Sequence, residues 1–138
     1  MHHIEIEYEG KLRTRAVHLQ SSQSIATDAP IDNEGKGENF SPTDLAVTAL
    51  GSCILTIMGI AADQHGFNIR GTRTEITKIM STNPRKVSKV IIHIYFSLRL
   101  NKKYKAILEK SAYSCPVCLS LNPDVVKNII FHYPNASD

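Results

Sequence analysis

The sequence predicts one α+β domain with antiparallel strands and a long central helix. Three observations support this prediction. The first two are the short alternating strands before residue 28 and the uncharged, largely apolar stretch at residues 45–62. A third is the block of strands and shorter helices after that stretch. A chain of 138 residues has the usual size of a single domain, and 42% apolar residues are enough for a core, so we predict one domain over 1–138.

The first third of the chain is predicted to be an antiparallel meander. Ile4, Ile6 and Tyr8 alternate with glutamates, which is the period of a strand with one apolar face. Gly10 introduces a turn into a second strand at about 12–20, and a third follows at about 24–27. Residues 28–40 are rich in turn formers and predict a polar loop.

The central helix has a clear start signal. Ser41 is a good N-cap, Pro42 suits the first helical position, and Asp44 completes a capping box. The helix is predicted to run to about Gln64, and Gly66 can adopt the left-handed conformation that ends it. Because this helix is apolar nearly all round, one small domain cannot cover it, and we expect a homodimer.

The rest of the chain predicts two strands, two helices and a last strand. Strands are expected at about 68–80 and 86–100, and a helix at about 103–114. A short helical turn at 117–121 and a strand at about 125–133 complete the order. The apolar stretch at 45–62 has borderline length for a membrane span, but small polar residues dilute it, so a helix buried in a soluble protein is favoured.

Composition limits which binding partners and which cellular compartment we expect. The net charge of +3 is mild, and no cluster of Lys and Arg is interleaved with aromatic residues, so no nucleic-acid partner is expected. The start of the chain does not resemble a secretory signal. Together with three cysteines, this predicts a reducing, cytoplasmic location and no membrane partner.

Two cysteines are candidates for chemistry. Cys53 lies within the central helix after Gly51 and Ser52, so it is either a small buried hydrophobe or a thiol that another group can approach. Cys115 lies where one helix ends, and Pro116 can begin the next turn. At such a helix N-terminus the free N–H groups are expected to lower a thiol pKa.

The Cys115-x-x-Cys118 spacing has two further interpretations, and neither is favoured. A thioredoxin-like dithiol should follow a strand, whereas a helix precedes this pair. A zinc site needs two more ligands at suitable spacing, but the histidines are scattered. We therefore expect no metal and no cofactor. Arg13 and Arg15 belong either to a solvated strand face or to a site where a cation stabilises a thiolate.

Three segments together resemble the OsmC/Ohr family, named for osmotically inducible protein C and organic hydroperoxide resistance protein. The segments are Phe-Ser-Pro-Thr-Asp-Leu at 40–45, Ala-Leu-Gly-Ser-Cys at 49–53 and Cys-Pro-Val at 115–117. The resemblance implies an intertwined, OsmC-like homodimer in which antiparallel sheets are wrapped around the long central helix, with active sites at the subunit interface. It also implies thiol-dependent reduction of organic hydroperoxides, with an external dithiol as reductant.

Carried onto this sequence, the resemblance makes Cys53 the peroxidatic thiol and Cys115 the resolving thiol. Arg13 best matches the arginine that stabilises the thiolate, with Arg15 as the alternative. The sequence departs from the family pattern at Thr43, where peroxidases of the family carry a glutamate that holds this arginine. Cys118 is additional, and is either a spare resolving thiol or a small core residue.

Three functions are compatible with these residues. The first is a thiol peroxidase acting on organic hydroperoxides. The second is an OsmC-like redox-sensing or small-molecule-binding module with little turnover, which the threonine at position 43 favours. The third is a structural dimer with incidental cysteines. Assays with different hydroperoxides and reductants discriminate among them.

Overall fold

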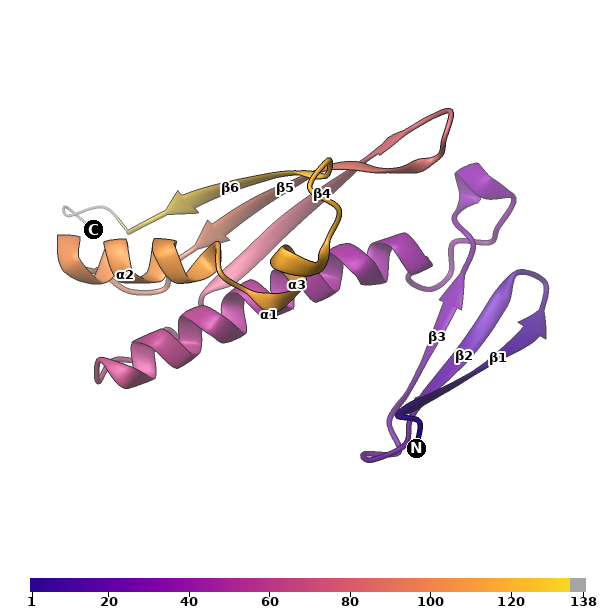
Figure 1. The fold of residues 1–138 in the computed structure, drawn as a ribbon, viewed down its shortest axis with the longest axis horizontal. Helices are drawn as coiled ribbons and strands as arrows, with labels where there is room; N and C mark the ends of the chain where they lie inside the picture. The colour runs from indigo at the N-terminus through magenta and orange to yellow at the C-terminus, as the bar shows by residue number, and fades with distance from the viewer. Residues whose placement is uncertain (135–138) are drawn as a thin grey trace. The chain divides into compact units, whose positions relative to one another are not determined.

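The computed structural model of the chain describes residues 1–134, and its chain trace is shown in Figure 1. The chain forms two compact units, one over Met1–Ala46 and the other from Val47 onward. Each unit is described separately below. The prediction of a single domain concerns residues 1–138, which is more of the chain than the structure describes, so it stays a prediction.

The first unit is the predicted three-stranded meander. Strands β1 (Ile4–Gly10), β2 (Arg13–His18) and β3 (Ser24–Asp28) pair antiparallel in the order β1-β2-β3. The loop after β3 contains a short 3₁₀ helix, η1 (Ile31–Asn33), which the sequence pattern did not predict.

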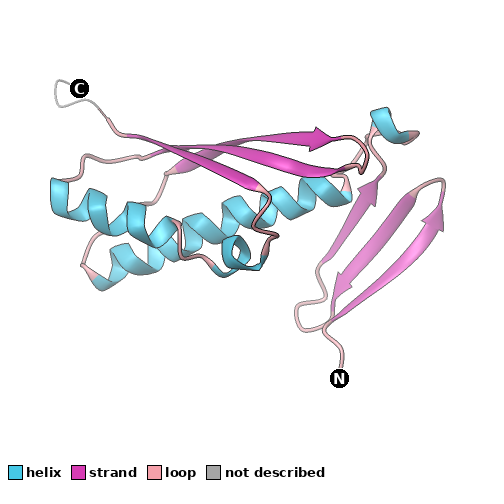
Figure 2. Ribbon diagram, turned by 45° about the horizontal axis from the view of Figure 1, so that its top comes forward, coloured by secondary structure: helices cyan, strands magenta, loops and turns pink. Residues whose placement is uncertain are grey.

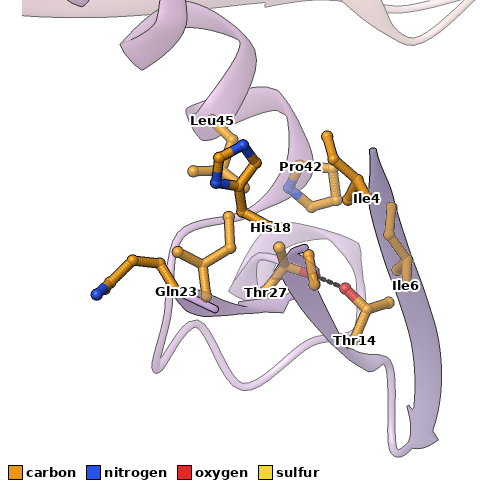
Figure 3. A pocket seen from close by; sticks show the side chains of 10 residues that line it. Ile4, Ile6, Thr14, His18, Gln23, Thr27, Pro42 and Leu45 are labelled. Atoms are coloured by element: carbon orange, nitrogen blue, oxygen red, sulfur yellow. Dashed lines mark hydrogen bonds between the residues drawn. The ribbon is translucent and has the colours of Figure 1, made fainter. Parts of the chain in front are cut away.

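One face of this first sheet is apolar and lines an open pocket. Because opposite residues in an antiparallel pair share a face, Ile6 of β1, Ala16 of β2 and Ile25 of β3 lie side by side. Pro42 and Leu45, which follow the loop, help to line the same hollow, whose volume is about 540 Å³ (Figure 3). Ile6 is 69% exposed, so the first unit does not by itself cover this apolar face.

Helix α1 (Pro42–Gln64) begins and ends where the sequence predicted. The capping box is formed in both directions: the Asp44 N–H donates to Ser41 Oγ at 3.0 Å, and the Ser41 N–H donates to Asp44 Oδ2 at 3.0 Å. After the helix, Gly66 has a positive φ of 78°, the left-handed conformation expected of a helix end.

The second unit packs helices on one face of a mixed sheet, as Figure 2 shows with helices in cyan and strands in magenta. Its strands are β4 (Arg73–Ser81), β5 (Lys86–Tyr95) and β6 (Val126–His132), in the order β4-β5-β6. Helices α2 (Lys102–Ala112) and α3 (Pro116–Ser120) connect β5 to β6.

The prediction of antiparallel sheets is wrong for one strand pair of the second unit. β4 and β5 are antiparallel, but β5 and β6 are parallel. The reason is the crossover through α2 and α3, which returns the chain to the end of the sheet where β5 began. Fold class is otherwise as predicted, with α+β architecture and a long central helix.

The predicted strand at 68–80 begins later, at Arg73. Asn68 Oδ1 accepts the Arg70 N–H at 2.7 Å, and the Thr72 N–H donates to the Ile69 carbonyl at 3.0 Å. These bonds close local turns, so the segment before Arg73 is not extended.

The core of the second unit joins α1, the sheet and α2. Fully buried side chains from these elements meet there: Leu50, Ile54 and Met58 of α1, Val90, Ile92 and Ile94 of β5, and Leu108 of α2. Gly51 permits the close approach of α1 to the sheet, because a methyl group there would overlap the Ile76 side chain.

Helix α1 is long and apolar enough to cross a membrane by length and composition, but part of it is a core helix. Its most apolar window is 39% buried within this chain, while Ile60 is 50% exposed. The second unit therefore buries one side of α1, and another side of this helix stays exposed.

Candidate functional site

The second unit brings all three cysteines of the chain into one neighbourhood, called here the thiol cluster: Cys53, Cys115 and Cys118. Cys53 lies in the middle of α1, Cys115 is the N-cap of α3, and Cys118 lies one turn further along α3. All three are free thiols. Cys115 is fully buried within the hydrophobic core, and the other two are half-buried against it.

Two contacts define the surroundings of Cys115. Its sulfur accepts the Cys118 N–H at 3.2 Å, and the Cys53 side chain lies near enough to raise its pKa. The residues Cys53 and Cys115 are 62 positions apart in the chain (115 minus 53). The fold of the second unit thus brings together the two thiols that the sequence singled out.

Burial raises the pKa of the Cys115 thiol to about 11, from an ordinary value of 9.0. The Cys118 N–H opposes this shift, while the neighbouring Cys53 side chain adds to it. The prediction that the helix N-terminus would lower this pKa is therefore wrong. Removing a thiolate from water costs more than one backbone N–H returns.

A pH titration tests this environment. In protein labelled with ¹³C at the cysteine Cβ atoms, the chemical shift of Cys115 reports its protonation, so no reagent has to reach the buried sulfur. The midpoint should lie near pH 11. Circular dichroism checks the fold at each pH. The guanidinium-unfolded chain is the control, which should titrate near pH 9; a midpoint near pH 8 in the folded protein would contradict the assignment.

Arg13 belongs to the first unit, where an ion-pair network holds it. Its Nε donates to Asp28 Oδ1 at 2.7 Å, and one terminal nitrogen donates to Asp28 Oδ2 at 3.0 Å. The same nitrogen donates to Glu38 Oε1 at 3.0 Å. The two-point contact with Asp28 fixes the plane of the guanidinium as well as its position.

Asp28 is buried, and both of its carboxylate oxygens accept hydrogen bonds. Besides Arg13, its Oδ2 accepts the Glu38 N–H and the Asn39 Nδ2, each at 3.1 Å. The hydrogen bond from Arg13 is the main cause that holds the pKa of the Asp28 carboxyl below its usual range, against the opposing effect of burial. Asp28, Glu38 and Asn39 are called here the clamp on Arg13. Because the pKa of Asp28 is lowered in the folded protein, Asp28 stays charged at neutral and mildly acid pH. It loses its charge only as the pH falls through that lowered value.

The two candidate arginines differ in how they are held. Arg15 is more exposed and makes one contact that the structure defines, from Nε to Glu9 Oε2 at 3.3 Å. Arg13 has two carboxylate partners, one of them buried. Thr43, the position of the family glutamate, lies at the start of α1, where its hydroxyl is 3.2 Å from Ser41 Oγ.

The clamp residues Asp28, Glu38 and Asn39 are absent from the sequence-based predictions. Asp28 faces Arg13 because β2 and β3 place these two residues opposite each other. That pairing depends on strand register, which the sequence did not define closely enough. The composition of the loop at 28–40 gave no further signal that its residues would approach an arginine.

Within residues 1–134, no group of three or more His, Cys, Asp or Glu side chains could hold a metal ion. The thiol cluster contributes the sulfurs of Cys53 and Cys115 and a third sulfur one helical turn beyond Cys115.

The sequence and the fold define the class of this protein. The family described as OsmC-like protein matches residues 35–129, and the chain belongs to this family. No match to the chain was found among curated proteins.

Solved structures give its particular relatives. A proposed osmotic stress induced and detoxification response protein from Psychrobacter arcticus is 49% identical, with a TM-score of 0.93 and 96% of each chain covered. An OsmC-like protein from Mycoplasma pneumoniae is 17% identical, with a TM-score of 0.79 and 96% of each chain covered. The organic hydroperoxide resistance protein OsmC of Legionella pneumophila is 13% identical, with a TM-score of 0.74, over 96% of this chain and 98% of that one. The last two likenesses concern the fold.

Proposed function

We propose that this protein is a thiol-dependent peroxidase that reduces organic hydroperoxides through Cys53 and Cys115. The observation that carries the proposal is that these two thiols, which come from distant parts of the chain, lie close together in one core cluster. Membership of the OsmC-like family and the fold shared with an organic hydroperoxide resistance protein support it.

The reaction needs no group beyond the thiols and an external dithiol. The Cys53 thiolate attacks one oxygen of the hydroperoxide, the O–O bond breaks, and the organic part leaves as an alcohol once protonated. Cys53 is then a sulfenic acid. The Cys115 sulfur attacks the Cys53 sulfur, water leaves, and a disulfide forms. The external dithiol reduces this disulfide and becomes a disulfide itself.

The roles follow from burial and protonation. Cys53 is half-buried, whereas Cys115 is fully buried, so a substrate meets Cys53 first. With a pKa of about 11, Cys115 is protonated at neutral pH, which suits a thiol that reacts second. Both residues lie against apolar side chains, so a bulky organic hydroperoxide should fit better than hydrogen peroxide.

Arg13 is the proposed cation for the Cys53 thiolate. A guanidinium stabilises a thiolate only if it is held in position, and the clamp of Asp28 and Glu38 does this. Asp28 thus holds Arg13 in position, as a glutamate at the position of Thr43 does in peroxidases of the family. On this account the loss of that glutamate does not remove activity.

Steady-state kinetics test the proposal. We expect turnover with cumene hydroperoxide and dithiothreitol, weaker turnover with hydrogen peroxide, and little turnover with glutathione as the only reductant. Oxidation of the thiols without turnover would favour the alternative, a redox-sensing or small-molecule-binding module. No oxidation of Cys53 by any hydroperoxide would contradict the peroxidase.

A second copy of the chain is the proposed partner. Each compact unit leaves apolar surface uncovered: the face of the first sheet with Ile4 and Ile6, and the outer side of α1 with Ile60. Ile4 and Ile6 are 56% and 69% exposed and belong to one contiguous apolar face, and a contiguous exposed face of this kind marks an interaction surface. A homodimer in which each copy covers these surfaces of the other removes them from water.

Light scattering at micromolar concentration should therefore give twice the chain mass of 15.3 kDa. We expect an interface of more than roughly 2,000 Å² in total, as obligate dimers have. Ile6→Glu, which places a charge on the apolar sheet face, should shift the protein toward monomer or aggregate, whereas Glu7→Lys on the opposite face should not. A stable monomer of the unmodified protein would contradict this assembly.

A further inference from the structure

We propose that Cys118 is a third redox thiol, which takes over the disulfide from Cys53 and presents it to the external reductant. The inference rests on the proposed peroxidase function and adds a step to it. After Cys53 and Cys115 have formed a disulfide, Cys118 exchanges with it. The oxidised pair then becomes Cys115 and Cys118, and Cys53 is free for the next substrate.

The geometry of α3 favours this exchange. Cys115 is the N-cap of α3 and Cys118 is three residues further, so the backbone N–H of Cys118 lies 3.2 Å from the Cys115 sulfur. Residues three apart in a helix have Cα atoms about 5 Å apart. This lies within the range of roughly 4.4–6.8 Å that a disulfide requires. Cys115 can therefore bridge to Cys118 without moving the helix far.

Burial of Cys115 makes a relay useful. In the disulfide between Cys53 and Cys115, attack at the Cys115 sulfur expels Cys53, whereas attack at the Cys53 sulfur expels Cys115, which burial makes a poor leaving thiolate. The Cys115 sulfur is fully buried, so an external dithiol cannot attack it directly. Cys118 is half-buried and already beside the Cys115 sulfur. It can attack the sulfur that the external reductant cannot reach.

The exchange is balanced and needs no additional oxidant. The Cys118 thiolate attacks the Cys115 sulfur, the bond between Cys53 and Cys115 breaks, and Cys53 leaves as a thiolate. The proton lost by Cys118 is taken up by Cys53. One disulfide and one thiol are present before and after, so no electrons enter or leave. The external dithiol then reduces the Cys115–Cys118 disulfide at its accessible sulfur.

Diamide oxidation tests the exchange apart from hydroperoxide chemistry. In the full-length protein with one equivalent of diamide, alkylation and peptide mapping at successive times should find Cys115–Cys118 as the main final disulfide, with Cys53 free. In Cys53→Ser, the same Cys115–Cys118 disulfide should form. A Cys53–Cys115 disulfide that persists in the unmodified protein, or no Cys115–Cys118 disulfide in Cys53→Ser, overturns the proposal.

Hydroperoxide consumption without reductant supplies the second readout. Because exchange frees Cys53, the unmodified protein should consume a second equivalent of cumene hydroperoxide, which leaves Cys53 as a sulfenic acid. Cys118→Ser and Cys118→Ala should stop after one equivalent, whereas Leu119→Ala, which changes an exposed side chain of the same helix, should consume two. Consumption of only one equivalent by the unmodified protein overturns the relay but leaves the peroxidase intact, whereas no consumption at all refutes the peroxidase itself.

Discussion

Replacing Cys53 by serine should abolish hydroperoxide turnover. The hydroxyl that replaces the thiol is a far weaker nucleophile at neutral pH, so the rate should fall on the order of 10³-fold or more, to the uncatalysed level. The side chain is half-buried and serine has nearly the same size, so the fold should survive. The measurement is cumene hydroperoxide consumption with excess dithiothreitol.

The matched control is Cys115→Ser. This variant keeps the first thiol but lacks the second, so it should consume one equivalent of hydroperoxide and stop, with Cys53 held as a sulfenic acid that dimedone labels. Thermal unfolding of both variants should stay close to that of the unmodified protein. Full activity in Cys53→Ser would refute the assignment of roles.

Replacing Arg13 by alanine should lower the rate of the first step by about 10²-fold. Loss of one aimed electrostatic group costs roughly 10²–10³-fold in other enzymes, and here the group is proposed to stabilise the attacking thiolate. Because the deficit lies in thiolate formation, raising the pH should partly restore the rate. Single-turnover oxidation of Cys53 as a function of pH measures both effects.

Arg15→Ala is the matched control for Arg13→Ala, because it removes the same charge from the same strand at a more exposed position. Its effect should be small. Asp28→Asn should reproduce part of the Arg13→Ala defect, since it removes the charge that aims the guanidinium. A large loss in Arg15→Ala with a normal Arg13→Ala would move the role to Arg15.

Local signals in the sequence were sufficient for the central helix. The cap at Ser41 and Asp44 depends on residues three positions apart, so the start of α1 could be predicted and is confirmed. The combination of motifs around Cys53 and Cys115 predicted that these thiols act together. The second unit places both thiols in one core cluster, and their joint action stays a prediction.

Features that depend on tertiary structure could not be predicted. The parallel pairing of β5 and β6 follows from the path of the crossover, and the clamp on Arg13 follows from the register that places Asp28 opposite it. The raised pKa of Cys115 depends on how deeply α3 packs into the core, whereas the sequence showed only its helix N-terminus. In each case the deciding contact joins residues that no local pattern connects.

The most direct test of the redox pair uses Cys118→Ser, in which exchange with the third thiol is blocked. One equivalent of cumene hydroperoxide is added without reductant, remaining thiols are alkylated, and the peptides are mapped by mass spectrometry. Our account predicts stoichiometric consumption of the hydroperoxide and one disulfide that joins Cys53 to Cys115. Unconsumed hydroperoxide with both thiols alkylated, or oxidation of Cys115 while Cys53 stays a free thiol, would contradict it.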